Sequence, residues 1–148
     1  MECTSHHLAQ LAQPGAFNFE VGLVDGRPAS KKLHKLVSEA LDTGPLAINY
    51  SVESRFSKLA TCRKSDMVLF RGADASMKVA QVQGHFDVEG IPVSMVTLYH
   101  FIKQDTARSS FWEPSTGGAE WVQTQCILDT LVYSILPSGK LMVLLATF

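Results

Sequence analysis

The stretch KVAQVQGHFDVEGIPVSMVTLYHFI, residues 78–102, decides the fold of this chain. Its first part, residues 78–86, alternates apolar and polar side chains with the period of two that is typical of a half-buried strand. Its second part, residues 91–102, carries apolar side chains on both faces, which indicates a strand covered on both sides. The Glu89-Gly90 pair between them is typical of a tight turn. The stretch therefore predicts a long antiparallel hairpin.

Shorter apolar runs on both sides of this hairpin predict further strands. These runs are residues 17–24, 46–52, 67–70, 121–125, 127–136 and 140–148. Pro137-Ser138-Gly139 joins the last two runs as a second hairpin. Short strands with close turns favour a small barrel from about residue 65 onward, since a barrel leaves few exposed strand edges. The last run is still apolar at Phe148, so it is either the last strand of the sheet or part of a longer chain.

Residues 28–42 predict one amphipathic helix. Apolar side chains recur there at the spacing of one helical face, namely at Leu33, Leu36, Val37, Ala40 and Leu41. Pro28 suits the first turn, where its missing N–H costs nothing, and Gly44-Pro45 suits a helix end. We expect the four large residues of this stripe to be buried, together with Val68, Phe70, Val82, Phe86, Val93, Met95, Leu98, Ile127, Leu131, Val143 and Leu145. The predicted fold class is α+β, mainly antiparallel β with a small barrel and one amphipathic N-terminal helix.

Length and composition predict one folded domain. The chain has 148 residues, of which 46% are hydrophobic and 18% charged, so it can bury a substantial core. We expect a single domain over residues 1–148, with a helix-containing part at 1–64 and a barrel-like part at 65–148. No apolar run reaches the roughly 18 residues that a membrane helix needs, so no membrane partner is expected.

The N-terminus and the cysteines predict an intracellular protein. Residues 1–13 lack the basic and apolar regions of a secretory signal. Cys3, Cys62 and Cys126 are odd in number and far apart, which does not suit a disulfide framework. Reduced thiols in a reducing compartment are therefore expected.

The sequence predicts no enzyme. It contains no motif of a hydrolase, a metalloprotease or a nucleotide-binding protein. His85 and Asp87 form an H-x-D triplet that could share one face of a strand, but the alternation of residues 78–86 places His85 on the polar face. Cys3 and His6 have a ligand-like spacing without the second pair that a zinc site needs. We therefore predict no catalytic residue, no metal and no cofactor.

Positive charge is concentrated between residues 27 and 78. Ten lysine and arginine residues stand there against five acidic residues, although the whole chain has a net charge of −1. The predicted nucleic-acid-binding residues of this segment are Lys31, Lys32, Lys35, Arg63 and Lys64. The three lysines lie in the first half of the predicted helix, where a bound phosphate would offset their repulsion by the helix dipole. The alternative is a solvated helix face.

Aromatic residues gather around an apparent loop in the second half of the chain. The predicted peptide-binding residues among them are Tyr99, Phe101, Trp112 and Trp121. Aromatic rings at the rim of a barrel can form a cage for a methylated ammonium group. The alternative is that the same rings pack within the barrel.

Four segments of the second half carry a family resemblance: Asp66-Met67-Val68-Leu69, Val79-Ala80-Gln81-Val82, Val96-Thr97-Leu98-Tyr99-His100-Phe101 followed by Gln104-Asp105-Thr106, and Glu120-Trp121-Val122. In this order, residues 66–143 resemble a bromo-adjacent homology (BAH) domain. The resemblance implies an SH3-like β-barrel that recognises chromatin or another protein without catalysis. It also implies a nuclear location.

The combined prediction is a non-catalytic binding module that recognises a protein or a chromatin peptide through a small β-barrel. The alternative is nucleic-acid binding through the basic segment 27–78, as part of a larger nucleic-acid-processing protein.

Overall fold

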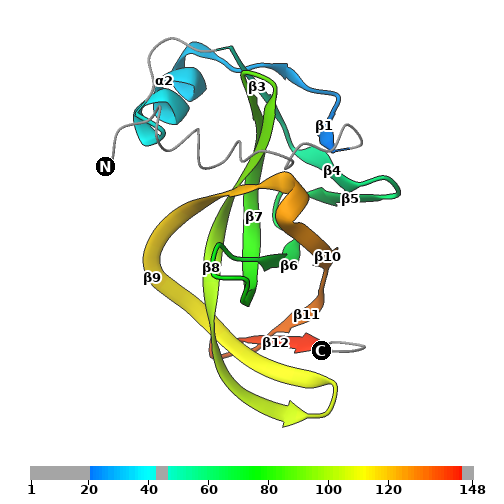
Figure 1. The fold of residues 1–148 in the computed structure, drawn as a ribbon. Coiled ribbons are helices and arrows are strands. Elements are labelled where there is room, and N and C mark those ends of the chain that lie inside the picture. The colour runs from blue at the N-terminus through cyan, green and yellow to red at the C-terminus, as the bar shows by residue number, and fades with distance from the viewer. Residues whose placement is uncertain (1–20, 43–46, 145–148) are drawn as a thin grey trace.

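The long hairpin predicted from residues 78–102 is present and lies at the centre of the large sheet (Figure 1). The computed structural model describes residues 21–42 and 47–144. The two strands of the hairpin pair antiparallel up to its tip, where Glu89 and Gly90 both have positive φ, 53° and 84°. A turn with two positive φ values matches the twist of the strands that it joins.

Strands on both sides of the hairpin extend it into one large sheet. The elements are β1 (Gly22–Val24), β2 (Arg27–Pro28), α2 (Lys31–Ala40), β3 (Ile48–Ser51), β4 (Glu53–Ser57), β5 (Ala60–Arg63), β6 (Met67–Arg71), β7 (Met77–Val88), β8 (Ile91–Thr106), β9 (Ser109–Gln123), η1 (Thr124–Cys126), β10 (Ile127–Thr130), β11 (Val132–Ile135) and β12 (Leu141–Leu144). The strand order of the large sheet is β10-β6-β7-β8-β9-β12-β11, with β3 paired to β7 and β2 paired to β3. The remaining strands form a small sheet of order β1-β4-β5.

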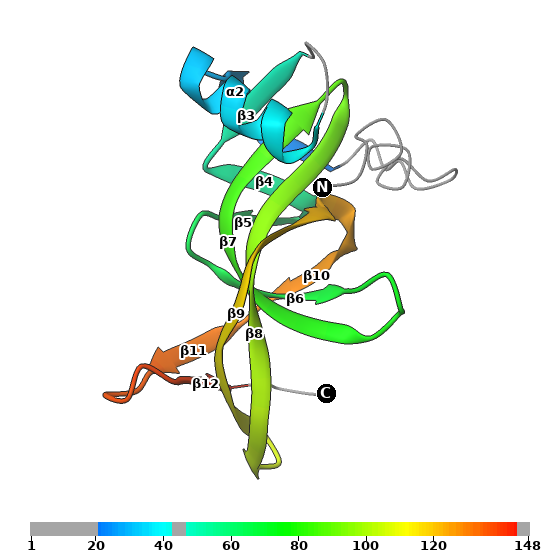
Figure 2. The ribbon, with the colours of Figure 1, turned by 90° about the vertical axis from the view of Figure 1, so that its left-hand side faces the viewer.

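One segment of the chain, residues 127–135, supplies both ends of this strand order. Its first part, β10, pairs with β6, and its second part, β11, pairs with β12. Only Leu131 separates the two parts, and its N–H donates to the Met67 carbonyl at 2.8 Å. The sheet therefore has to curl until its two ends meet along this segment, and Figures 1 and 2 show the resulting half-barrel. The prediction of a mainly antiparallel, curled β structure is confirmed.

A bulge in β7 changes which side chains face the core. Val82 pairs with Val96, whereas Gly84 already pairs with Met95, so Gln83 is an extra residue in β7. An extra residue reverses the alternation of the strand beyond it. His85 is therefore turned inward and is fully buried. The prediction that His85 lies on the polar face was wrong for this reason.

The helix is present, but it is shorter than predicted. It begins after Ser30, whose hydroxyl accepts a hydrogen bond from the Leu33 N–H at 3.2 Å, and α2 ends at Ala40. Its buried stripe is narrow, because Leu33, Val37 and Leu41 follow one another at a spacing of four and pack on the sheet. Leu36 lies beside this stripe and is 54% exposed, so the prediction that it is buried was wrong. Within the described residues, no helix is long and apolar enough to span a membrane.

Three clusters of buried side chains make up the core. The first contains Phe56, Cys62, Val68, Phe70, Ala80, Val82, Val96 and Ile127. Val122 of β9 packs on this cluster as well, and because β9 and β10 are distant in the strand order, the cluster marks the concave side of the sheet. The second cluster lies beneath α2 and contains Phe86, Val88 and Val93, and the third lies beside β12.

Most of the predicted core is confirmed. The predicted residues that are buried are Val37, Leu41, Val68, Phe70, Val82, Phe86, Val93, Ile127 and Val143. Leu33, Met95, Leu98 and Leu131 are partly buried and pack against the clusters. Leu145, residues 17–20 of the first predicted strand, Cys3 and His6 lie outside the described residues.

Candidate binding site

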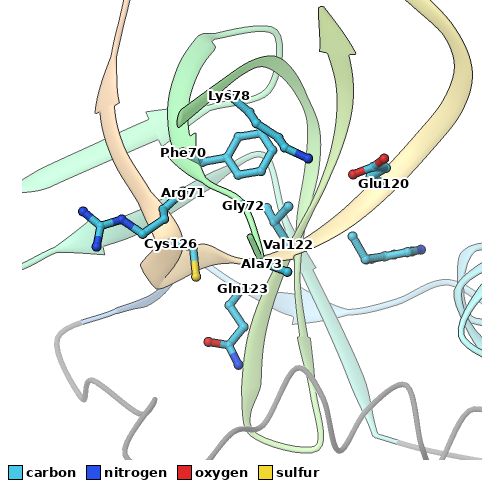
Figure 3. A pocket seen from close by; sticks show the side chains of 10 residues that line it. Phe70, Arg71, Gly72, Ala73, Lys78, Glu120, Val122, Gln123 and Cys126 are labelled. Carbon is cyan, nitrogen blue, oxygen red and sulfur yellow. The ribbon is translucent and has the colours of Figure 1, made fainter. Parts of the chain in front are cut away.

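A pocket of about 580 Å³ opens where the end of β6, the start of β7 and the end of β9 come together (Figure 3). Its lining comes from residues 70–73, Lys78, residues 120–123 and Cys126. This volume lies within the range of roughly 300–1,000 Å³ that is usual for ligand pockets. The pocket is therefore large enough to hold a side chain or a short segment of another molecule.

Strand register explains why charged and apolar residues meet in this pocket. Lys78 pairs with Phe70, and Glu120 pairs with Val96, both partners belonging to the concave core cluster. Paired residues of neighbouring strands point to the same face of a sheet. Lys78 and Glu120 consequently lie on the concave side, and Figure 3 shows their charged ends directed toward each other across the pocket.

The floor of the pocket is apolar. Phe70 is 2% exposed, and Val122 is partly buried against the same cluster. Arg71 also lines the pocket, but its guanidinium points away from Lys78 (Figure 3). The site thus combines an apolar floor with the opposed charges of Lys78 and Glu120 at its rim.

Gly72 leaves room for the stem of Lys78. A Cβ atom at this position would lie 2.8 Å from Lys78 Cε and 3.2 Å from Cδ, so only glycine allows this close approach. The turn that follows is also ordered, since Asp74 Oδ1 accepts hydrogen bonds from the N–H and the hydroxyl of Ser76, at 3.1 and 2.6 Å. The hydrogen bond from the Ser76 hydroxyl lowers the pKa of Asp74. The turn beside this part of the pocket is therefore held by its own hydrogen bonds.

A row of buried polar side chains lies deeper in the same concave core. Cys62 Sγ is 3.5 Å from His85 Nε2, His85 Nδ1 is 2.7 Å from Ser94 Oγ, and Ser94 Oγ is 2.8 Å from Thr124 Oγ1. All four residues are fully buried. The row links β5, β7, β8 and η1.

The electrostatics of this row oppose nucleophilic catalysis. Burial raises the pKa of the Cys62 thiol to about 12, and the nearby carboxylates of Asp66 and Glu53 act in the same direction. Burial also lowers the pKa of His85 to about 4, although the contact with Cys62 and the same carboxylates oppose this change. A cysteine nucleophile needs the thiolate and access to its substrate. The row instead holds a neutral thiol and a neutral imidazole away from solvent.

The four aromatic residues predicted to bind a peptide do not form one group. Phe101 and Trp112 face each other across β8 and β9, with ring centroids 5.4 Å apart, and Tyr99 packs on the same core cluster as Trp112. Phe101 is 55% exposed, whereas Trp112 is 9% exposed and its indole N–H donates to Ser110 Oγ. Trp121 lies further along the hairpin, and its ring packs on Phe86 at 5.3 Å. Of the four, only Trp121 lines the pocket.

The five predicted nucleic-acid-binding residues lie on two separate elements. Lys31, Lys32 and Lys35 are exposed on α2, where Lys35 is 4.0 Å from Glu39. Arg63 is at the end of β5, 3.7 Å from Glu53, and Lys64 follows it as an exposed residue. Their interaction with nucleic acid stays a prediction.

Comparisons with known proteins do not assign this chain to a family. No protein-family model matches the sequence, and no curated protein and no solved structure is significantly similar to it. In the part of the chain that the structure describes, no three His, Cys, Asp or Glu side chains are grouped as metal ligands. The site therefore has to be interpreted from its own residues.

Sequence reasoning missed the two residues at the rim of the pocket. Lys78 was noted only as part of the basic segment, and Glu120 only as part of the family resemblance. No strand is predicted between residues 102 and 121, but β9 runs through most of this stretch and brings Glu120 opposite Val96. A strand signal in β9 is weak because Ser115, Thr116, Gly117 and Gly118 interrupt its alternation.

Proposed function

We propose that this protein is a non-catalytic binding module that holds a peptide segment of a partner protein in the pocket of its half-barrel. The observation that carries the proposal is the apolar floor of Phe70 and Val122 beneath the opposed charges of Lys78 and Glu120. An apolar side chain of the peptide would fill the floor. An acidic side chain next to it would bind Lys78, and backbone or basic groups would bind Glu120.

The shape of β9 supports an extended peptide as the occupant. Ala119 pairs with Thr97 and Pro114 pairs with Tyr99, so residues 115–118 have no register partner on β8. A side chain at Gly118 would meet open space, and a Cβ at Gly117 would make only an ordinary contact with Ser115 Oγ at 3.6 Å. Exposed backbone beside a pocket suits peptides, which bind by main-chain hydrogen bonds and by pockets for alternate side chains. Recognition of chromatin and a BAH-like, SH3-like barrel remain narrower forms of the same proposal.

Fluorescence anisotropy with labelled peptides tests the proposal. The panel contains acidic-apolar and basic-apolar peptides of equal length, methylated and unmethylated histone-tail peptides, and duplex and single-stranded oligonucleotides. We expect an acidic-apolar peptide to bind and Lys78→Glu to weaken it roughly 10- to 100-fold, as the loss of a charged hydrogen bond does. Lys64→Glu makes the same change of charge on an exposed residue outside the pocket and should leave binding unchanged.

The panel also contains the outcomes that contradict the proposal. Equal losses in both variants would mean general electrostatic attraction, which is the behaviour expected for nucleic-acid binding through the basic segment. Binding of a methylated peptide that depends on Phe101 and is indifferent to Lys78→Glu would move the site to the exposed ring of Phe101. Either result would rule out the pocket as the peptide site.

A further inference from the structure

The last strand of the large sheet, β11, is an open apolar edge. It is four residues long, Val132-Tyr133-Ser134-Ile135, and among the described strands it pairs only with β12. Val132 is 66% and Ile135 67% exposed, and Tyr133 is 36% exposed. Exposed edges are usually protected by a very short strand, or by charged residues, proline or a bulge that blocks pairing with another chain. β11 carries no charged residue and no proline, and Figure 2 shows it on the outside of the half-barrel beside β12.

The backbone of β11 also presents hydrogen-bonding groups to this edge. In an antiparallel strand, successive residues direct their N–H and C=O groups to opposite sides. The Leu136 N–H donates to the Lys140 carbonyl on the β12 side, whereas the Leu131 N–H donates to Met67 on the other side. By the same alternation, Tyr133 and Ile135 direct their N–H and C=O groups away from β12. No described strand pairs with them there.

We propose that β11 pairs with β11 of a second copy of this chain, antiparallel about a twofold axis at Ser134. In this register, Tyr133 of each copy lies opposite Ile135 of the other and exchanges both backbone hydrogen bonds with it. All of the outward groups of Tyr133 and Ile135 are then satisfied. A register shifted by two residues toward Leu131 would use Leu131, whose N–H is already bonded, and a shift the other way would use Pro137, which has no N–H.

The side chains of β11 also favour a second copy of this chain as the partner of this edge. The register places Tyr133 beside Ile135 of the second copy, and aromatic residues opposite β-branched ones are favourable cross-strand pairs. Since β11 has no charged side chain, its own copy meets no like-charge repulsion. A contact of four residues is smaller than the roughly 1,200 Å² of a stable interface, so the dimer is weak and depends on concentration.

Sedimentation velocity over protein concentrations from about 5 to about 500 µM measures this equilibrium. The full chain should shift from monomer to dimer, and Ile135→Lys should raise the dissociation constant at least about tenfold, because lysine on an edge blocks pairing. Leu59→Lys is the matched control, since Leu59 is 94% exposed in the turn between β4 and β5. A monomer at every concentration would overturn the proposal. So would a dimer that weakens equally in both variants, because that behaviour means nonspecific apolar contact.

A disulfide tests the register. Ser134 would face Ser134 of the second copy at a position without backbone hydrogen bonds, where side chains lie closest. Ser134→Cys should form a covalent dimer under mild oxidation, and Ser138→Cys, in the exposed turn outside β11, should not. The unmodified chain, oxidised in parallel, gives the background from its own cysteines. Cross-linking at Ser138 that equals or exceeds that at Ser134 would contradict the register.

Discussion

Protonation of His85 should make this protein markedly less stable in mild acid. Burial lowers the pKa of His85 from 6.5 to about 4 in the folded protein, whereas the unfolded chain keeps the ordinary value. Above pH 6.5, the imidazole is neutral in both states and has no effect on stability. As the pH falls from 6.5 to 4, the unfolded chain binds the proton first, so the free energy of unfolding decreases. At about 1.4 kcal/mol for each pH unit, the loss is about 3 kcal/mol, and it levels off below pH 4.

Urea unfolding followed by tryptophan fluorescence at several pH values from 7 to 4 measures this loss. Carboxylates also titrate in this range, so the comparison is with His85→Gln, which stays neutral and can still form hydrogen bonds in the row. We expect the original chain to lose about 3 kcal/mol more than the variant between pH 6.5 and 4. His100→Gln, at an exposed position, controls for the removal of a histidine. Equal pH dependence in the original chain and in His85→Gln would refute the reasoning.

The effects of further substitutions on stability and binding should depend on burial and backbone geometry. Leu41→Ala should lower the free energy of unfolding by about 2–5 kcal/mol because Leu41 is fully buried, whereas Leu36→Ala should cost less than about 1 kcal/mol, both measured by urea unfolding. Ser30→Ala should cost about 1 kcal/mol through loss of the helix cap, with reduced helix content in circular dichroism. Gly72→Ala should leave thermal stability almost unchanged but weaken peptide binding, because Lys78 has to move. Above pH 9, the unfolded chain ionises its Cys62 thiol before the folded protein does, so unfolding at pH 10 should be easier than at pH 8. Cys62→Ala should reduce this difference, and the rest comes from Cys126 and Tyr99, whose pKa values burial also raises.

The parts of the fold that sequence predicted are those with local signals. The alternation of residues 78–86 and the Glu89-Gly90 turn predicted the hairpin, because period and turn chemistry act within a few residues. The helix was predicted by its apolar spacing, but Pro28 lies in β2 rather than in the first helical turn. Pro28 instead pairs with Asn49 of β3, and a partner so distant in the sequence cannot be predicted from local spacing.

The parts that sequence could not predict depend on bulges and on distant partners. Gly84, an isolated glycine within a strand pattern, is a sign of a bulge that does not say which residue is inserted. The insertion of Gln83 sends His85 inward to Cys62, 23 positions away in the chain. The hairpin of β4 and β5 was not predicted either. Its inward-facing residues are Ser54, Phe56 and Cys62, and all three are buried. Ser54 and Cys62 have small side chains that give little sign of a strand in the sequence.

The proposed dimer edge, unlike the pocket, arises from the way that the sheet ends. Residues 127–135 leave β6 after Leu131 and continue along β12, so β11 has β12 on one side and no described strand on the other. A segment that stayed on β6 throughout would leave no such edge. The two sites lie at opposite ends of β9, since residues 120–123 line the pocket and residues 109–112 pair with β12. Lys78→Glu should therefore impair peptide binding without changing the dimer, and Ile135→Lys should have the reverse effect. If either substitution changed both properties, the two surfaces would be coupled through β9, and each experiment would have to be repeated at a protein concentration where only the monomer is present.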